Sequence, residues 1–325
     1  GDAAVDVDFE LASGIGYTVT GGHALDLSGA NSIGDTTTTF TVEAGSTLTA
    51  TAAQLDGVTI VGDGQVIVTD LDTSPGVDLS GITADTTLLL TNNVTLAAEG
   101  RLPTAAVTLD GEFALNTTAA NNFDATSVAV PVNASLLATA DQLNAIPVTG
   151  AGTVTISALN ASTADLSEVD ATTVELDTES SSVAFNGTLA DRTYDVTGSG
   201  TLDLSGATID TTFVLAANTD LVLLAAQVGS DGSTTISDSG TSTVTVLALE
   251  DQPDADLSNI TVDELIAWVD VGSGVTLTGN LSDANLVVTD STDPSGTLNV
   301  VQAVGIDTID FNDLVMDVLM TREQF

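Results

Sequence analysis

The chain has 325 residues, and its 46 acidic side chains against three basic ones give a net charge of −43 at pH 7. Phosphate backbones are bound through Lys and Arg, so this charge excludes nucleic acid as a natural partner and disfavours anionic lipid surfaces. Cys is absent, which excludes disulfides, and no apolar run reaches the roughly 18 residues of a membrane-spanning helix.

The first predicted element is an internal repeat. Residues 17–30 recur at 194–207 with ten of fourteen positions identical, and both copies contain the run Asp-Leu-Ser-Gly-Ala. With a degenerate copy counted, the steps from one Asp-Leu-Ser element to the next range from 38 to 53 residues, so the period is loose. A repeated unit of this size is typical of stacked architectures, in which neighbouring units share one core. The Asp-Leu-Ser elements begin at Asp26, Asp78, Asp165, Asp203 and Asp256, with a degenerate copy at Asp124.

A second element lies between these copies. It is Gly-x-Gly followed by alternating apolar residues, at 62–68, 150–156 and 198–204. Alternation with period two predicts half-buried strands, and the Gly, Asp and Asn residues around them predict tight turns. Aromatic residues are only 3%, which suits the narrow core of a solenoid. We therefore predict an all-β chain that forms a parallel β-solenoid (β-helix) of roughly 20–26 residues per coil. Tandem β-sandwich modules are the alternative.

The C-terminal residues depart from this pattern. The repetitive β-strand array is predicted to cover residues 1–301, and residues 302–325 to form a cap or an assembly tail. Apolar side chains follow helical spacing there, which indicates a short helix covering the end of the stack. Docking on a neighbouring subunit and a secretion or anchoring signal are the alternatives. The helically spaced residues are Phe311, Leu314, Val315, Val318 and Leu319.

The residue types that carry catalysis are sparse or unspecific. His23 is the only His, and we interpret it as a surface turn residue. Without a second His or any Cys, an ordinary zinc site cannot form. Asp is so abundant that a pair of carboxylates in the sequence is not a specific signal for glycoside hydrolysis. We expect no enzymatic activity and no catalytic residues.

Calcium is the most credible ligand of the chain, although no cofactor is certain. Closely spaced Asp residues in turns offer the hard oxygen ligands that calcium binds. No segment matches the EF-hand loop or the Gly-Gly-x-Gly-x-Asp nonapeptide. The alternative is that these carboxylates only close turns. The candidate metal ligands are Asp70, Asp72, Asp254, Asp256, Asp290 and Asp293.

Over residues 15–300, the Cys-free, Lys-free composition and elements such as 150–156 resemble the β-strand repeats of bacterial surface proteins. These include surface-layer subunits, adhesins and extracellular filaments. The resemblance implies a non-enzymatic structural protein, located outside the cell or on a virion, that self-assembles into a layer or filament. Salt or divalent cations would screen its charge. Partners would be further copies, joined through chain ends and the C-terminal segment. The alternative is an adhesin or phage tail-fibre module that binds a cell-surface glycan.

Overall fold

The computed structural model describes residues 5–6, 11–30, 33, 36–209, 211–230, 233–270, 275–278, 280–289, 297–299, 304–310 and 317–319. The chain divides into two compact units. Unit 1 comprises residues 1–156 and 168–174, and unit 2 comprises residues 157–167 and 175–325. Each unit is a parallel β-solenoid, which confirms the predicted fold class and excludes the sandwich alternative.

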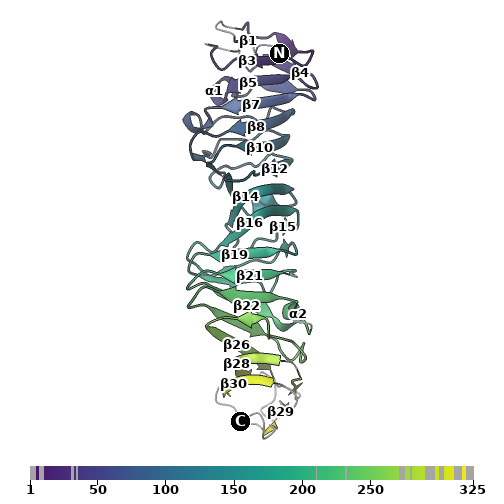
Figure 1. Ribbon diagram of the computed structural model, residues 1–325, viewed down its shortest axis with the longest axis vertical. Helices are drawn as coiled ribbons and strands as arrows, with labels where there is room; N and C mark the ends of the chain where they lie inside the picture. The colour runs from purple at the N-terminus through teal and green to yellow at the C-terminus, as the bar shows by residue number, and fades with distance from the viewer. Residues whose placement is uncertain are drawn as a thin grey trace. The chain divides into compact units, whose positions relative to one another are not determined.

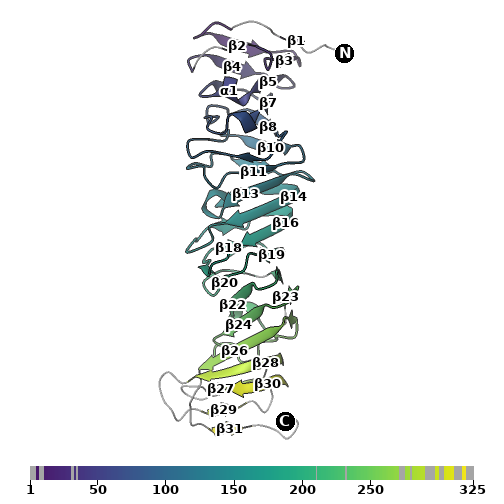
Figure 2. The same ribbon diagram turned by 90° about the vertical axis from the view of Figure 1, so that its left-hand side faces the viewer.

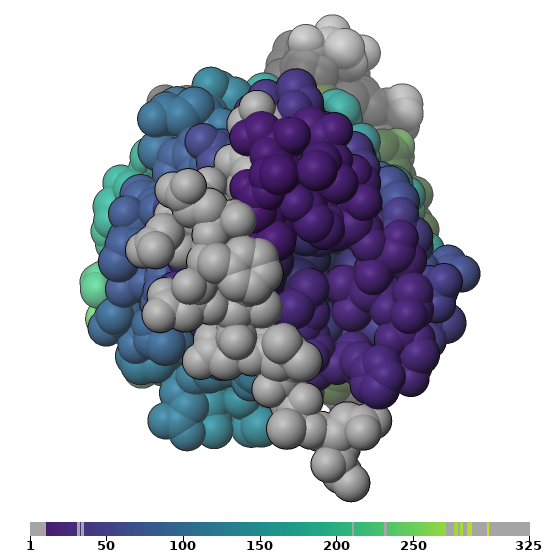
Figure 3. All heavy atoms as spheres, turned by 90° about the horizontal axis from the view of Figure 1, so that it is seen from above, coloured from purple at the N-terminus to yellow at the C-terminus, as the bar shows by residue number. Residues whose placement is uncertain are grey.

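Unit 1 contains three ladders of parallel strands, the longest of which descends the upper half of Figure 1. That ladder consists of β1 (Val5–Asp6), β3 (Ala24–Asp26), β5 (Thr47–Thr51), β7 (Gln65–Thr69), β8 (Asp85–Leu89), β10 (Ala106–Asp110), β12 (Ser127–Ala129) and β14 (Val148–Ser157). The second ladder is β2 (Gly16–Val19), β4 (Thr39–Val42) and β6 (Thr59–Val61), and the third is β9 (Val94–Thr95), β11 (Ala114–Asn116) and β13 (Ser135–Thr139). Figure 3 looks onto the N-terminal end of this unit, where the first described coils (purple) lie over those that follow.

Unit 2 repeats this plan (Figure 2). Its long ladder is β17 (Val183–Ala184), β20 (Thr201–Asp203), β22 (Asp220–Leu224), β24 (Thr243–Leu247), β26 (Glu264–Asp270), β28 (Asn280–Thr289) and β30 (Val304–Asp310). A second ladder is β19 (Thr193–Thr197), β21 (Thr212–Leu215), β23 (Thr235–Asp238) and β25 (Ile260–Thr261), and the last residues of β16 (Val169–Asp177) pair with β19. Two shorter ladders complete the unit. One is the pair β15 (Asp165–Leu166) and β18 (Thr188–Leu189), and the other has three strands, β27 (Val275–Thr276), β29 (Thr297–Asn299) and β31 (Asp317–Leu319).

The helical elements of the described residues are single turns at coil corners. They are α1 (Ala52–Leu55), α2 (Ala225–Val228), and the 3-10 turns η1 (Leu71–Thr73) and η2 (Asp141–Leu143). None of the helices in the described part of the chain has the length and apolar character needed to cross a membrane.

The register sets the length of a coil. Leu48 pairs with Leu25 in the preceding coil and with Val66 in the following one, which are steps of 23 and 18 residues. Ile236 and Ile260 are 24 residues apart. Because each strand pairs in parallel with the next coil, the alternating side chains of successive strands stack into a continuous core. Leu48 and Val66 are fully buried, and each such side chain contributes about 1.5–3 kcal/mol by burial.

The Gly-x-Gly elements are corners where the backbone passes close over the preceding coil. Gly62 has φ +118°, and a Cβ there would lie 2.2 Å from the carbonyl oxygen of Val42. The amide of Gly64 donates to that same oxygen at 2.9 Å. Gly150 has φ +122° and the same close approach to Val130. Only glycine tolerates both the positive φ and the contact, which explains why the element recurs.

The helical prediction for the C-terminal residues is wrong where the structure describes them. Residues 304–310 form β30, which pairs with β28, and residues 317–319 form β31, which pairs with β29. The strand array therefore continues past residue 301. The backbone of each preceding coil offers unpaired hydrogen-bonding groups, and these favour an added strand over an isolated helical turn. Residues 311–316 and 320–325 lie outside the described residues, and the cap or assembly role stays a prediction.

Candidate functional site

The Asp-Leu-Ser elements form Asx turns. In the copy at Asp78, the carboxylate Oδ1 accepts from the amide of Ser80 at 2.9 Å and from its hydroxyl at 2.5 Å. The central Leu79 is buried in the core. The polar ends therefore turn the backbone while the leucine anchors the corner. In the other copies, the serine amide donates the same hydrogen bond to the aspartate carboxylate, from Ser28 to Asp26, Ser167 to Asp165, Ser205 to Asp203, and Ser258 to Asp256.

The turns at Asp78 and Asp165 favour the ionised form of their carboxylates. Burial opposes ionisation of Asp78, but the hydrogen bonds from Ser80 and the charge of Arg101 outweigh it and lower the pKa of Asp78. The hydroxyl and amide of Ser167 lower the pKa of Asp165 in the same way. Donors aimed at a carboxylate stabilise its charged form, so the turns at Asp78 and Asp165 are coupled to ionisation.

A glutamine clamp joins an Asp-Leu-Ser element to the next coil. Gln54 lies on α1, and its Nε2 donates to the carbonyl oxygens of Leu27 and Ala30, both at 2.8 Å. Its Oε1 accepts from the amide of Thr51 at 2.8 Å. One side chain thereby satisfies two carbonyls of one coil and an amide of the next, which is the pairing that part-buried backbone groups require.

The clamp occurs three times in the part of the chain that the structure describes. In the second copy, Nε2 of Gln142 on η2 donates to the carbonyls of Thr117 and Ala120 at 2.8 and 3.0 Å. In the third, Nε2 of Gln227 on α2 donates to the carbonyls of Leu204 and Ala207, both at 2.7 Å. The short sequences that carry it are Thr-Ala-Ala-Gln-Leu at 51–55, Thr-Ala-Asp-Gln-Leu at 139–143 and Leu-Ala-Ala-Gln-Val at 224–228.

The second clamp reveals an Asx turn that the sequence analysis did not find. Asn116 takes the place of the aspartate, and its Oδ1 accepts from the amide and hydroxyl of Thr118 at 2.9 and 2.8 Å. The copy predicted at Asp124 does not form the expected turn, because the amide of Thr126 donates to Ala105 instead.

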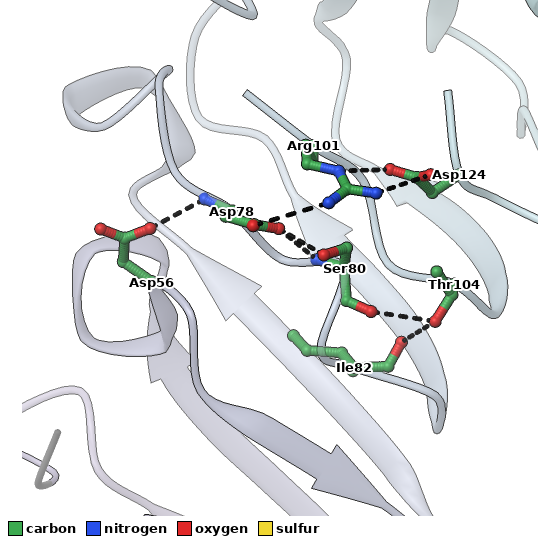
Figure 4. Close-up of polar contacts among 7 residues, drawn as sticks. All are labelled: Asp56, Asp78, Ser80, Ile82, Arg101, Thr104 and Asp124. Atoms are coloured by element: carbon green, nitrogen blue, oxygen red, sulfur yellow. Dashed lines mark hydrogen bonds and ion pairs between the residues drawn. The ribbon is translucent and has the colours of Figure 1, made fainter. Parts of the chain in front are cut away.

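Asp124 instead belongs to an acidic column with Arg101 at its centre (Figure 4). Nε and Nη2 of Arg101 donate to its two carboxylate oxygens at 2.9 and 3.0 Å, while Nη1 lies 3.8 Å from Asp78. Asp56 accepts from the amide of Asp78 at 2.8 Å. These residues come from successive coils, about 22 positions apart. One arginine thus bridges the carboxylates of the coils on either side.

The described candidate calcium ligands form two pairs, with Asp70 and Asp72 at the single turn η1 and Asp254 and Asp256 two positions apart in another coil. Asp70 has φ 54°, and its backbone carbonyl accepts from Thr73; the carboxylate of Asp72 accepts from Asn92 at 2.8 Å. The carboxylate of Asp254 accepts from Gln252 at 2.6 Å, and that of Asp256 from Ser258. Asp290 and Asp293 lie outside the described residues. Over the described part of the chain, no three His, Cys, Asp or Glu residues gather into a potential metal site. Calcium binding therefore stays a prediction.

A shallow polar hollow lies beside the second clamp. Its volume is about 460 Å³, and it is lined by exposed amides, a carboxylate and an aromatic ring. Such a surface can bind hydroxyl groups and stack on a ring. Among the lining residues, Asn121, Asn122 and Asp141 are exposed, and Phe123 is half-buried.

The repeat also positions two tyrosines. Tyr17 stacks on Phe40 with ring centroids 5.5 Å apart, and Tyr194 on Phe213 at 6.2 Å. Burial raises the pKa of Tyr194 to about 12, against the hydrogen bond from Ala190 and the charge of Arg192. His23 lies on an exposed turn, as predicted.

Comparison with known proteins gives no assignment: no family model, curated protein or solved structure matches the chain.

Proposed function

We propose that the chain is a non-enzymatic structural protein of the cell or virion surface that self-assembles into a layer or filament. The main support is that the repeated polar side chains bond to the backbone of the coils. Gln54, Gln142 and Gln227 each bridge two carbonyls of the preceding coil, and the Asp-Leu-Ser elements turn its corners. The recurring residues thus maintain a stack rather than converge on a substrate.

The charge of the chain gives this assembly a dependence on salt. With a net charge of −43, copies repel one another unless cations screen or bridge their carboxylates. Screening by monovalent salt acts over about 10 Å at 0.1 M, whereas calcium bridges carboxylates directly. We therefore propose that association rises with ionic strength, and that calcium promotes it beyond the effect of ionic strength alone.

Sedimentation velocity of the purified chain tests this function. NaCl and CaCl₂ series at matched ionic strength, each followed by EGTA, separate screening from specific bridging. The proposal expects large species that grow with salt, that form at lower ionic strength with calcium, and that EGTA disperses. A single monomeric boundary across all conditions would contradict it.

Glycan binding is a second candidate, which the hollow around Asn121, Asn122 and Phe123 favours. Amides can donate hydrogen bonds to sugar hydroxyls and accept them, carboxylates can accept them, and an aromatic ring can cover the apolar face of a sugar. A glycan array with the native chain and with Phe123→Ala tests it. Hits that the substitution removes would support this function, and an array without hits would exclude it.

A further inference from the structure

The outward face of the long ladder in unit 2 carries an apolar stripe, which we define as Leu224, Leu247, Trp268 and Val287. Leu224 pairs with Leu247, and Trp268 pairs with Val287. Leu247 and Trp268 each lie one position beyond the paired residues Val246 and Ala267, so the two pairs are adjacent. The strands β22, β24, β26 and β28 that carry the stripe lie one below the other in Figure 2.

The stripe points away from the core. Its residues alternate with fully buried neighbours, as Leu223, Val246, Ala267 and Leu286 show. Trp268 is 38% exposed and is the only tryptophan of the chain. On a protein with 3% aromatic residues, a tryptophan at the centre of an outward apolar column needs a reason beyond the fold.

The three clamps provide an internal comparison. The residue three positions before the clamp glutamine is Thr51 in the first copy and Thr139 in the second, and each hydroxyl accepts from the amide of its glutamine, at 3.3 and 3.2 Å. In the third copy the position is Leu224, which has no hydroxyl and extends the stripe instead. A threonine here would accept the hydrogen bond that caps the clamp helix, and leucine cannot. Functional positions often depart from such local preferences.

Acidic side chains flank the stripe along the strand where it crosses β26. The outward face of β26 reads Glu264, Ile266, Trp268, Asp270, so carboxylates flank the apolar centre at a separation of about 20 Å. The carboxylate of Glu250 accepts from the amide of Asp270 at 2.9 Å, which adds a third acidic group at that end. A complementary surface therefore has an apolar centre between two cations.

We infer that the stripe binds an extended polypeptide segment whose apolar residues are flanked by Lys or Arg. A second copy does not supply this, because the chain has three Arg, no Lys and 46 acidic residues. The inference does not depend on the proposed assembly. Copies that associate elsewhere leave the stripe open, and copies that associate through it support assembly while overturning the inference.

The probe is the synthetic peptide Lys-Thr-Val-Thr-Leu-Thr-Lys, which in an extended conformation presents Lys, Val, Leu and Lys on one face. Its matched control, Lys-Thr-Ser-Thr-Ser-Thr-Lys, has the same charge and no apolar centre. Emission from Trp268 reports binding directly, because no other tryptophan is present. We expect a saturable blue shift with the first peptide and affinity at least roughly tenfold lower for the control.

Two variants locate the effect. Leu247→Thr keeps the reporter and should weaken binding of the apolar peptide roughly fivefold or more, because it removes apolar contact area. Val214→Thr, at a 36% exposed position on β21 in another ladder, should leave the affinity unchanged. Circular dichroism melts of both variants verify that they fold.

Several results would overturn the inference. Equal affinity for the two peptides would mean that charge alone attracts them. If neither peptide binds, the proposed class of partner is wrong. An emission shift on raising the protein concentration without peptide would assign the stripe to a second copy. A shift on adding simple sugars would assign it to a glycan.

Discussion

Replacing Gln142 should destabilise unit 1 more than any ordinary surface substitution. Its Nε2 donates to the carbonyls of Thr117 and Ala120, and its Oε1 accepts from the amide of Thr139 and the hydroxyl of Thr117. Gln142→Ala removes all four bonds and leaves part-buried backbone groups without partners. At about 0.5–1.5 kcal/mol for each of the four bonds, the free energy of unfolding should fall by about 2–6 kcal/mol.

Gln142→Glu separates the donor role from the shape of the side chain. A carboxylate keeps both acceptor contacts but cannot donate to the two carbonyls. We expect a loss similar to that of the alanine variant at pH 7, with partial recovery as the new carboxyl protonates and gains one donor. Gln65→Ala is the matched control, because Gln65 is exposed and its side chain donates only to Thr87. It should cost less than about 0.5 kcal/mol.

Urea unfolding followed by circular dichroism gives the free energies, and hydrogen exchange of the Thr139 amide gives a local readout. With two units, unfolding has to be tested for a single transition before a free energy is assigned. If Gln142→Ala and Gln65→Ala agree within about 0.5 kcal/mol, or if exchange at Thr139 is unchanged, the clamp contributes nothing and the reasoning is refuted.

Three further predictions concern charge and burial. Because the pKa of Asp78 is lowered in the folded chain, its ionised carboxylate contributes to folding stability above the unfolded pKa of about 3.9, and this contribution is lost as the pH falls through the folded pKa. The stability difference between wild type and Asp78→Asn should therefore shrink on acidification. A constant difference from pH 6 to pH 2 would refute this. Tyr194 should ionise near pH 12, and because its pKa is raised by folding, folding stability should fall as the pH rises from about 10 to 12. An absorbance titration at 295 nm of wild type and Tyr194→Phe measures the ionisation of this tyrosine. Identical absorbance curves at high pH in the two proteins would contradict the prediction. The melting temperature should rise between about 10 mM and 500 mM NaCl, because screening reduces repulsion among the 46 acidic side chains, and a flat or falling curve would exclude that repulsion as an important term.

The strands and corners were predictable because their signals are local. Alternation at Val66 and Val68 marks a buried strand face, and Gly62 and Gly64 mark the corner before it. The Asp-Leu-Ser elements were recognisable as turns, since the aspartate and serine interact across only two positions.

The clamps were not predictable in this way. Each glutamine bonds to carbonyls 20 to 27 positions earlier, and backbone carbonyls leave no sequence signature. The only available signal was the recurrence of Ala-x-Gln after the turn element, at a spacing that varies between copies. Asn116 was missed because asparagine replaces the expected aspartate while keeping the same acceptor oxygen.

The helical prediction for the C-terminal residues was wrong at 304–310 and 317–319 for a different reason. Apolar residues spaced three and four apart, such as Val315, Val318 and Leu319, suit a helix, but short strands separated by turns produce the same spacing. Pairing with the preceding coil decides between the two, and that pairing depends on tertiary structure.

Electron microscopy of the purified chain, imaged with and without calcium at near-physiological salt, tests the central claim most directly. The proposed function predicts ordered sheets or filaments with a regular repeat that EGTA disperses. A field of separate particles of monomer size under every condition would contradict it.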